Sequence, residues 1–158
     1  MKTALIWGGA FLVLGTANSL ILHKEHLLAH GEVMLLELAP RDPRSLMQGD
    51  YMVLDYALAR DEILPGRDRI PASGHLVVTL DQHHAAHLER LHQGEPLAPG
   101  EHLLRFRYRG RLRLGAESFF FQEGNAGRYE EARYGELRVA PSGTSVLVGL
   151  RGADREPL

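Results

Sequence analysis

GDYMVLDY, from Gly49 to Tyr56, joins a turn to a strand and is the most informative segment of this chain. After the turn, Met52, Leu54 and Tyr56 recur at every second position, which is the period of a half-buried β-strand. We therefore expect a strand over residues 51–59. Tyr56 would share its apolar face, and Tyr51 would point to the other side. Gly49 allows the positive φ that a turn into this strand requires.

The residues before this segment favour a turn-rich loop from position 40 to position 48. Asp42 followed by Pro43 is a typical N-cap and first helical residue, so one helical turn is expected over 42–47. Asp50 can accept backbone N–H bonds from the loop or pair with Arg44. Two interpretations stay open: a rigid structural corner, or a cluster of Arg44, Asp50 and Tyr51 that binds a partner or small ligand. An arginine, an aspartate and a tyrosine form no nucleophile–base set, which disfavours catalysis.

The octapeptide matches the pattern G-D-Y-x-x-L-x-Y at every specified position. These positions are Gly49, Asp50, Tyr51, Leu54 and Tyr56. The chain therefore resembles the GDYXXLXY family of bacterial membrane-anchored proteins, over residues 1–150. The resemblance implies a single N-terminal membrane helix and a gene often placed beside those of multi-spanning membrane proteins. It carries over no catalytic residues.

The N-terminal segment from Ala4 to Leu22 carries no charge, and its 19 residues are about the minimum for a membrane-spanning helix. A cleaved signal peptide is the alternative, with a weak small-residue site at residues 15–17. Apolar residues 20–22 continue past that site and favour an uncleaved anchor. Lys2 before the segment favours a cytoplasmic amino terminus, which would put the folded domain on the periplasmic side of a bacterial inner membrane.

The rest of the chain is predicted to form one β-rich domain. Strand-like segments recur at residues 33–38, 51–59, 75–80, 103–108, 112–114, 118–122, 136–140 and 145–150. Short helices are expected at 81–92 and 125–133. The fold class is therefore mainly β: a single N-terminal transmembrane helix followed by an antiparallel β-sandwich or barrel-like domain with one or two short helices.

These segments suggest four parts along the chain. We expect a membrane anchor at residues 1–24, a short juxtamembrane helix or linker at 25–31, the β-rich domain at 32–150 and a frayed polar tail at 151–158.

Composition excludes several functions. The net charge of −2 implies no nucleic-acid partner. The chain has no cysteine, which removes disulfides, thiol catalysis and thiolate metal sites. Lys2 and Lys24 are its only lysines, so the soluble domain has none to activate Ser45 or to form a Schiff base.

Five arginines at alternate positions are a second candidate site. They are Arg105, Arg107, Arg109, Arg111 and Arg113. A strand would place them on one face, and a turn at Gly110 would set them opposite one another across a hairpin. Like charges placed opposite each other repel, so something acidic should offset them. Phospholipid headgroups, the acidic surface of a partner, or glutamates of a neighbouring strand would each do so.

His83 and His87 would lie one turn apart on the expected helix at 81–92, with Asp81 nearby. This spacing suggests a two-ligand metal face, but the glutamate of the zinc protease motif is missing. We expect a surface helix there, with no metal and no cofactor.

The sequence favours a membrane-anchored, non-enzymatic domain that acts as an accessory or structural subunit of a bacterial inner-membrane assembly. Its partners would be the lipid bilayer and a multi-spanning membrane protein. One alternative is an anion- or small-ligand-binding sensory module that uses the Arg44, Asp50 and Tyr51 corner with the arginine stripe. The other is a metal-assisted hydrolase using His83 and His87.

Overall fold

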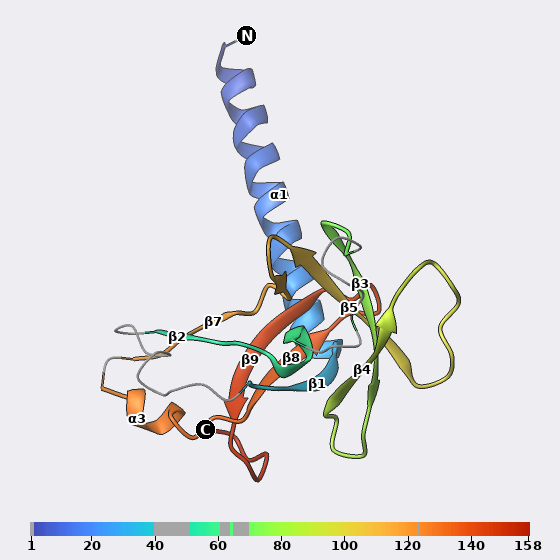
Figure 1. Ribbon diagram of the computed structural model, residues 1–158. Coiled ribbons are helices and arrows are strands. Elements are labelled where there is room, and N and C mark those ends of the chain that lie inside the picture. Colours follow the sequence, from blue (N-terminus) through green and yellow to red (C-terminus); the bar gives the residue numbers. More distant parts are fainter. Residues whose placement is uncertain (1, 40–50, 61–63, 65–69, 123) are drawn as a thin grey trace.

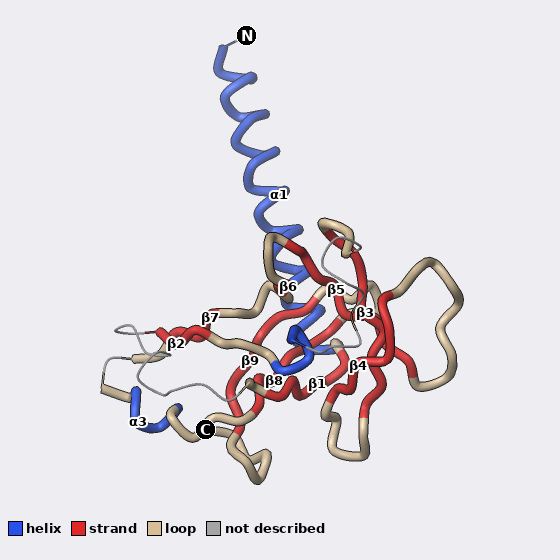
Figure 2. Tube along the Cα trace, in the orientation of Figure 1, coloured by secondary structure: helices blue, strands red, loops and turns tan. Residues whose placement is uncertain are grey.

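The computed structural model describes residues 2–39, 51–60, 64, 70–122 and 124–158, and its fold is mainly β (Figures 1 and 2). The strands are β1 (Glu32–Glu37), β2 (Tyr51–Val53), β3 (Ser73–Leu80), β4 (Ala86–Leu91), β5 (Glu101–Tyr108), β6 (Leu112–Arg113), β7 (Ser118–Phe120), β8 (Tyr134–Val139) and β9 (Ser145–Arg151). The helices are α1 (Lys2–His30), the 3-10 helix η1 (Ala57–Arg60) and the short α3 (Ala126–Tyr129). The predicted class, with an N-terminal apolar helix followed by an antiparallel β domain, is confirmed.

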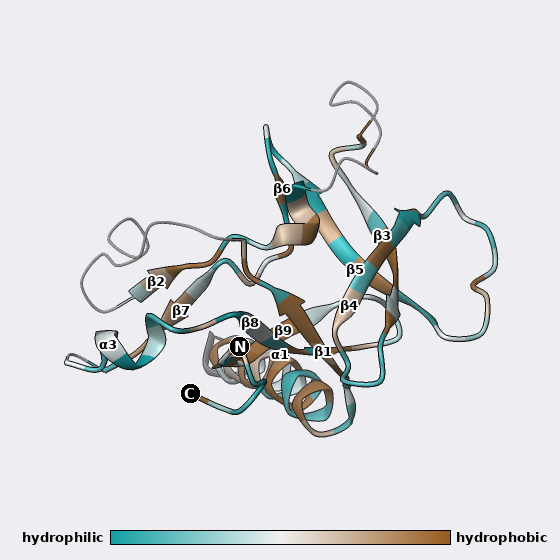
Figure 3. Ribbon diagram, turned by 60° about the horizontal axis from the view of Figure 1, so that its bottom comes forward, coloured by the Kyte–Doolittle hydropathy of each residue, from teal (hydrophilic) through white to brown (hydrophobic). Residues whose placement is uncertain are grey.

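The strands form two main sheets and one separate ribbon, all paired antiparallel. The sheets have the orders β1-β8-β9 and β4-β3-β5-β6, and the ribbon pairs β2 with β7. A single parallel bridge between Leu35 and Ala85 joins the two sheets at one side. At the other side, the Arg105 N–H donates to the Gly143 carbonyl at 2.8 Å. The two sheets, joined at these points, curve around one core as a half-barrel, and the β2–β7 ribbon extends from it together with α3 (Figures 1 and 3).

The core lies between the two sheets and is filled by alternating apolar side chains. Met34, Leu36, Leu76, Val78, Leu104, Phe106, Leu137, Val139 and Leu150 are among its buried members. Along β5 the buried Leu104 and Phe106 alternate with exposed Arg105 and Arg107, and Figure 3 shows hydrophilic segments between the apolar ones. This alternation fixes which side of β5 faces solvent.

Helix α1 protrudes from the domain as one unbroken rod (Figure 1). Residues Ile6–His30 are long and apolar enough to cross a membrane, and none of the most apolar stretch is buried in the domain. Polar side chains within it bond to the helix itself: Thr16 Oγ1 donates to the Leu12 carbonyl and Asn18 Nδ2 to the Leu14 carbonyl, each at 2.8 Å. Such bonds leave these polar groups satisfied where no water is present.

The expected strand over residues 51–59 is shorter than predicted, although its burial pattern is right. Met52, Leu54, Tyr56 and Leu58 are all buried, but β2 ends at Val53 and η1 begins at Ala57. After β2 the chain changes neighbours, because the Leu54 N–H donates to Glu117 whereas Tyr56 bridges to Leu38. Every second residue from 52 to 58 is therefore buried, although this segment does not pair with one strand along its whole length.

The helix expected at residues 81–92 is wrong, because this segment is a tight turn followed by β4. Asp81 Oδ1 accepts the backbone N–H groups of His83 (2.7 Å) and Ala85 (2.9 Å), which fixes the turn. The pairing of β4 with β3 shifts register between Val77 and Val78, and this bulge leaves one extra residue on β4. Because of the extra residue, Leu88 and Leu91 both pack on the core although they are three positions apart. A spacing of three is typical of a helix, which explains the wrong prediction.

The tail is not frayed as expected. Arg151 bridges to Pro157, and the Leu158 N–H donates to the Leu150 carbonyl at 3.1 Å. Leu158 also packs against the core, so the polar residues at 152–156 form a turn between two anchored points.

Candidate functional site

The predicted motif corner falls partly outside the described residues. Asp42, Arg44, Gly49 and Asp50 lie outside the described residues. Their clustering with Tyr51 as a binding site therefore stays a prediction. The second half of the motif, from Tyr51 to Tyr56, lies within the described residues.

Leu54 and Tyr56 belong to the core, with 2% and 1% of their surfaces exposed. The Tyr56 hydroxyl donates to the Ala116 carbonyl at 2.6 Å, across 60 positions of sequence. Burial, followed by the charge of Glu117, raises the pKa of Tyr56 well above its usual range, so this phenol stays protonated. A Cβ added to Gly135 would lie 3.0 Å from the Tyr56 ring, so glycine is what lets the ring fit there. These contacts give this half of the motif a structural role.

Tyr51 lies on the other side of the β2–β7 ribbon and is half-buried. Its ring packs on Phe120 with 5.7 Å between centroids, and Phe120 itself is 74% exposed. Next to the buried Leu54, the Asp55 carboxylate accepts from Arg60 Nε at 3.1 Å. The opposite orientation of Tyr51 and Tyr56 thus follows from the alternation in sequence.

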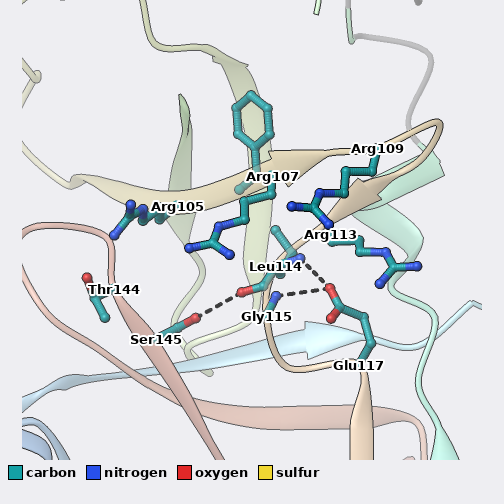
Figure 4. A pocket seen from close by; sticks show the side chains of 10 residues that line it. Arg105, Arg107, Arg109, Arg113, Leu114, Gly115, Glu117, Thr144 and Ser145 are labelled. Carbon is teal, nitrogen blue, oxygen red and sulfur yellow. Dashed lines mark hydrogen bonds between the residues drawn. The ribbon is translucent and has the colours of Figure 1, made fainter. Parts of the chain in front are cut away.

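A cavity of about 400 Å³ lies between the β5–β6 hairpin and the turn that joins β8 to β9. Its lining residues are Arg105, Phe106, Arg107, Arg109, Arg113, Leu114, Gly115, Glu117, Thr144 and Ser145. Figure 4 shows the guanidinium groups of Arg105 and Arg107 extending from β5 towards the segments that carry Thr144, Ser145 and Gly115. We refer to this cavity as the arginine pocket.

Strand pairing explains how the arginines meet. Gly110 takes a φ of 73° at the turn, and Arg107 then pairs directly with Arg113 across the hairpin. The expectation that arginines oppose one another is therefore confirmed at this pair. Arg111 is exposed in the turn and does not line the pocket, so the predicted stripe of five contributes four residues to the site.

Nothing acidic on the neighbouring strand offsets these charges. The residues of β3 that pair with Arg105 and Arg107 are His75 and Ser73. Within the part of the chain that the structure describes, none of the four pocket arginines forms an ion pair. The glutamates of a neighbouring strand considered from sequence are thus not what balances them.

Glu117, Thr144 and Ser145 complete the pocket, and sequence reasoning missed all three. One oxygen of Glu117 accepts the backbone N–H groups of Leu114 and Gly115, the latter at 3.0 Å (Figure 4). Ser145 Oγ donates to the Leu114 carbonyl at 3.5 Å. The sequence indicates a hairpin at the Pro-Ser-Gly turn before Thr144. It does not indicate that this turn packs against β5.

The two histidines considered for metal binding do not share a helical face. His83 lies in the turn after β3, and His87 lies on β4, where its Nε2 is 3.9 Å from Asp81 Oδ2. Among the described residues, no three histidine, aspartate or glutamate side chains are grouped to hold a metal ion. The geometric basis for the metal-assisted hydrolase is therefore absent from this part of the chain.

Fold and site together define a β-rich domain that carries an arginine-lined cavity and a protruding N-terminal helix long enough to span a membrane. The model of the GDYXXLXY protein family matches residues 13–150, which is most of the chain. The chain therefore belongs to the GDYXXLXY family, and the predicted resemblance is confirmed. No curated protein and no solved structure matches it.

Proposed function

We propose that this protein is a membrane-anchored, non-enzymatic accessory subunit of a bacterial inner-membrane assembly, with its β domain on the periplasmic side. The observation that carries the proposal is helix α1, which runs without a break from its exposed apolar part into contact with the sheet. An anchor on a flexible linker would only tether a domain. A helix that continues into the fold also sets the position of the domain at the membrane.

The junction between helix and sheet is clamped by packing and by hydrogen bonds. Leu27 is 3% exposed, and the Gly31 N–H donates to its carbonyl at 2.8 Å. Arg138 Nη1 on β8 donates to the Gly31 carbonyl at 3.1 Å, which ties the helix end to the sheet. A Cβ added to Gly31 would lie 2.6 Å from the Leu27 carbonyl oxygen, so the close approach depends on glycine.

The exposed part of α1 offers a face on which another helix can pack. Nothing lies within 4 Å of a Cβ built on Gly8, Gly9 or Gly15. Gly8 and Gly15 are seven residues apart and therefore share one side of the helix. Small residues let two membrane helices approach closely, which is how such helices associate without a hydrophobic driving force between them. This supports a multi-spanning protein as the partner.

Affinity capture from the native host tests the proposal. The full-length protein would be extracted in mild detergent as wild type, as Gly8→Leu/Gly15→Leu and as Ala17→Leu. Ala17 lies about opposite the two glycines, so it gives a leucine of the same size on the other face. We expect the wild type and Ala17→Leu to retain the same multi-spanning protein, and the double variant to lose it.

A fourth bait, Asp50→Ala, asks whether the motif corner also contacts the partner. Loss with this variant, while the secondary structure measured by circular dichroism is kept, would place a contact at the corner. If no multi-spanning protein is retained by the wild type, the accessory role is wrong. If all baits retain it equally, the glycine face is not the contact.

An anion- or ligand-binding module is the second candidate, and the arginine pocket favours it. The pocket brings four guanidinium groups to one cavity, an arrangement that a purely structural subunit does not need. The two functions are compatible in one protein.

A further inference from the structure

We propose that the arginine pocket is a binding site for a phosphate group, carried either by a small phosphate or phosphate monoester in solution or by a lipid headgroup. This site rests on the second proposed function, anion binding, and not on the accessory role, because it depends on the lining of the pocket and not on a protein partner.

Three of the described arginines outside the pocket pair with carboxylates, whereas the four pocket arginines, which are exposed, pair with none in the described part of the chain. Arg60 pairs with Asp55, Arg90 with glutamates 95 and 101, and Arg151 with Glu136. The pocket arginines, in contrast, have no carboxylate partner in the described part of the chain, and two of them face each other across the hairpin. Like charges held opposite each other repel, so a bound anion would stabilise this site.

The chemistry of the lining groups also suits a phosphate. A guanidinium presents its N–H donors as a planar fork that matches two phosphate oxygens at once, and it stays charged at every relevant pH. Thr144 adds a hydroxyl donor on the facing wall, where the Ser145 hydroxyl donates to the Leu114 carbonyl. The lining holds four positive side chains and one negative one, Glu117, whose Oε1 is already bonded to two backbone N–H groups. The balance therefore favours an anion.

The size of the cavity also suits this ligand. A cavity of about 400 Å³ is within the range of small-molecule sites and holds a phosphate together with part of the group that bears it.

The test is a thermal melt of the full-length protein in a zwitterionic detergent, followed by circular dichroism. Sodium phosphate is compared with sodium chloride at equal ionic strength, which separates specific binding from screening. Binding to the folded state raises Tm, by roughly 3–6 °C at a phosphate concentration about tenfold above the dissociation constant. We expect this rise in the wild type.

The variant Arg107→Gln/Arg113→Gln removes the opposed pair from the pocket. The control Arg111→Gln/Arg128→Gln removes the same charge from exposed positions outside it. We expect the pocket variant to melt slightly above the wild type in chloride, because the opposed charges are gone, and to lose the phosphate response. The control should keep that response. A raised Tm in chloride also shows that the pocket variant is folded.

The second arm identifies the source of the phosphate. The same three proteins are placed in nanodiscs of phosphatidylcholine with or without phosphatidic acid, which presents a phosphate monoester at the bilayer surface. A response to phosphatidic acid that the pocket variant lacks, without a response to free phosphate, assigns the site to a headgroup. The reverse assigns it to a soluble ligand. Absence of both responses in the wild type, or equal responses in the pocket variant and the control, overturns the proposal.

Discussion

At the scale of single residues, Tyr56 shows what the family motif does in its described half. Its ring fills the core and is 1% exposed, while its hydroxyl reaches the carbonyl of Ala116 between β6 and β7. One side chain thus joins the segment after β2 to the segment before β7. A tyrosine is suited to this place because it supplies both a large apolar surface and one donor at its end.

We expect Tyr56→Phe to lower the free energy of unfolding by about 1–3 kcal/mol, because the buried Ala116 carbonyl would lose its donor. Denaturant unfolding monitored by circular dichroism measures this. Tyr108→Phe is the matched control: Tyr108 also packs on the core, but its hydroxyl makes no hydrogen bond within the described residues. A similar loss in both variants would show that the Tyr56 hydroxyl bond contributes nothing specific.

At the scale of elements, the connection between β4 and β5 is held by one arginine. Arg90 Nε donates to Glu95 Oε1 and its Nη2 to Glu101 Oε2, each at 2.9 Å. Glu101 also accepts the Ala98 N–H at 2.8 Å, and Glu95 accepts that of Gln93 at the same distance. A loop of nine residues without secondary structure is thereby bonded to both strands that it joins.

This cluster predicts a loss of stability in acid. The hydrogen bond from Arg90, with that from Ala98, lowers the pKa of Glu101 from 4.5 to about 2, and backbone N–H groups, followed by Arg90, do the same for Glu95. Because both pKa values are depressed in the folded state, the stabilisation is complete above pH 4.5 and is lost as the pH falls towards 2.

We expect Glu101→Gln to have a lower denaturant midpoint than the wild type at neutral pH. As the pH falls, the midpoint of the variant should decrease less than that of the wild type. Denaturant midpoints measured across this pH range test it. The control is Glu130→Gln, at an exposed residue that forms no ion pair within the described part of the chain. Parallel acid profiles for Glu101→Gln and the wild type would contradict the assignment.

Strands could be predicted where apolar and polar residues alternate without interruption. The β8–β9 hairpin and β5 follow from simple alternation and appear where expected. The β4 segment was misread because its bulge shifts the alternation by one residue, so the inward side chains Leu88 and Leu91 fall at a helical spacing. A bulge depends on the neighbouring strand and leaves no mark of its own in one sequence.

At the scale of the whole molecule, α1 and the β domain form one continuous body joined at Leu27 and Gly31. The domain therefore has little freedom to turn away from the membrane if the helix spans it. Orientation across the bilayer then decides which compartment the arginine pocket meets.

Because the chain has no cysteine, single cysteines report this orientation without background. In intact cells whose outer membrane is opened, we expect Glu130→Cys to react with a membrane-impermeant maleimide. Lys2→Cys should react only after the inner membrane is permeabilised. The reverse pattern would place the domain in the cytoplasm, and a mature protein that lacks the residue 2 label altogether would mean that the N-terminal segment is cleaved.

The sequence by itself determined the apolar helix, the strand alternation and the family, because each depends on residues that are close together in the chain. It also placed arginines on one side of a hairpin, since strand parity and one glycine turn suffice for that. Only the tertiary structure decided that Arg111 lies outside the pocket, that Thr144 and Ser145 form its far wall, and that no carboxylate of β3 offsets the charge. Those facts depend on how the β8–β9 turn meets β5 about 40 residues away, and packing between sheets sets that contact.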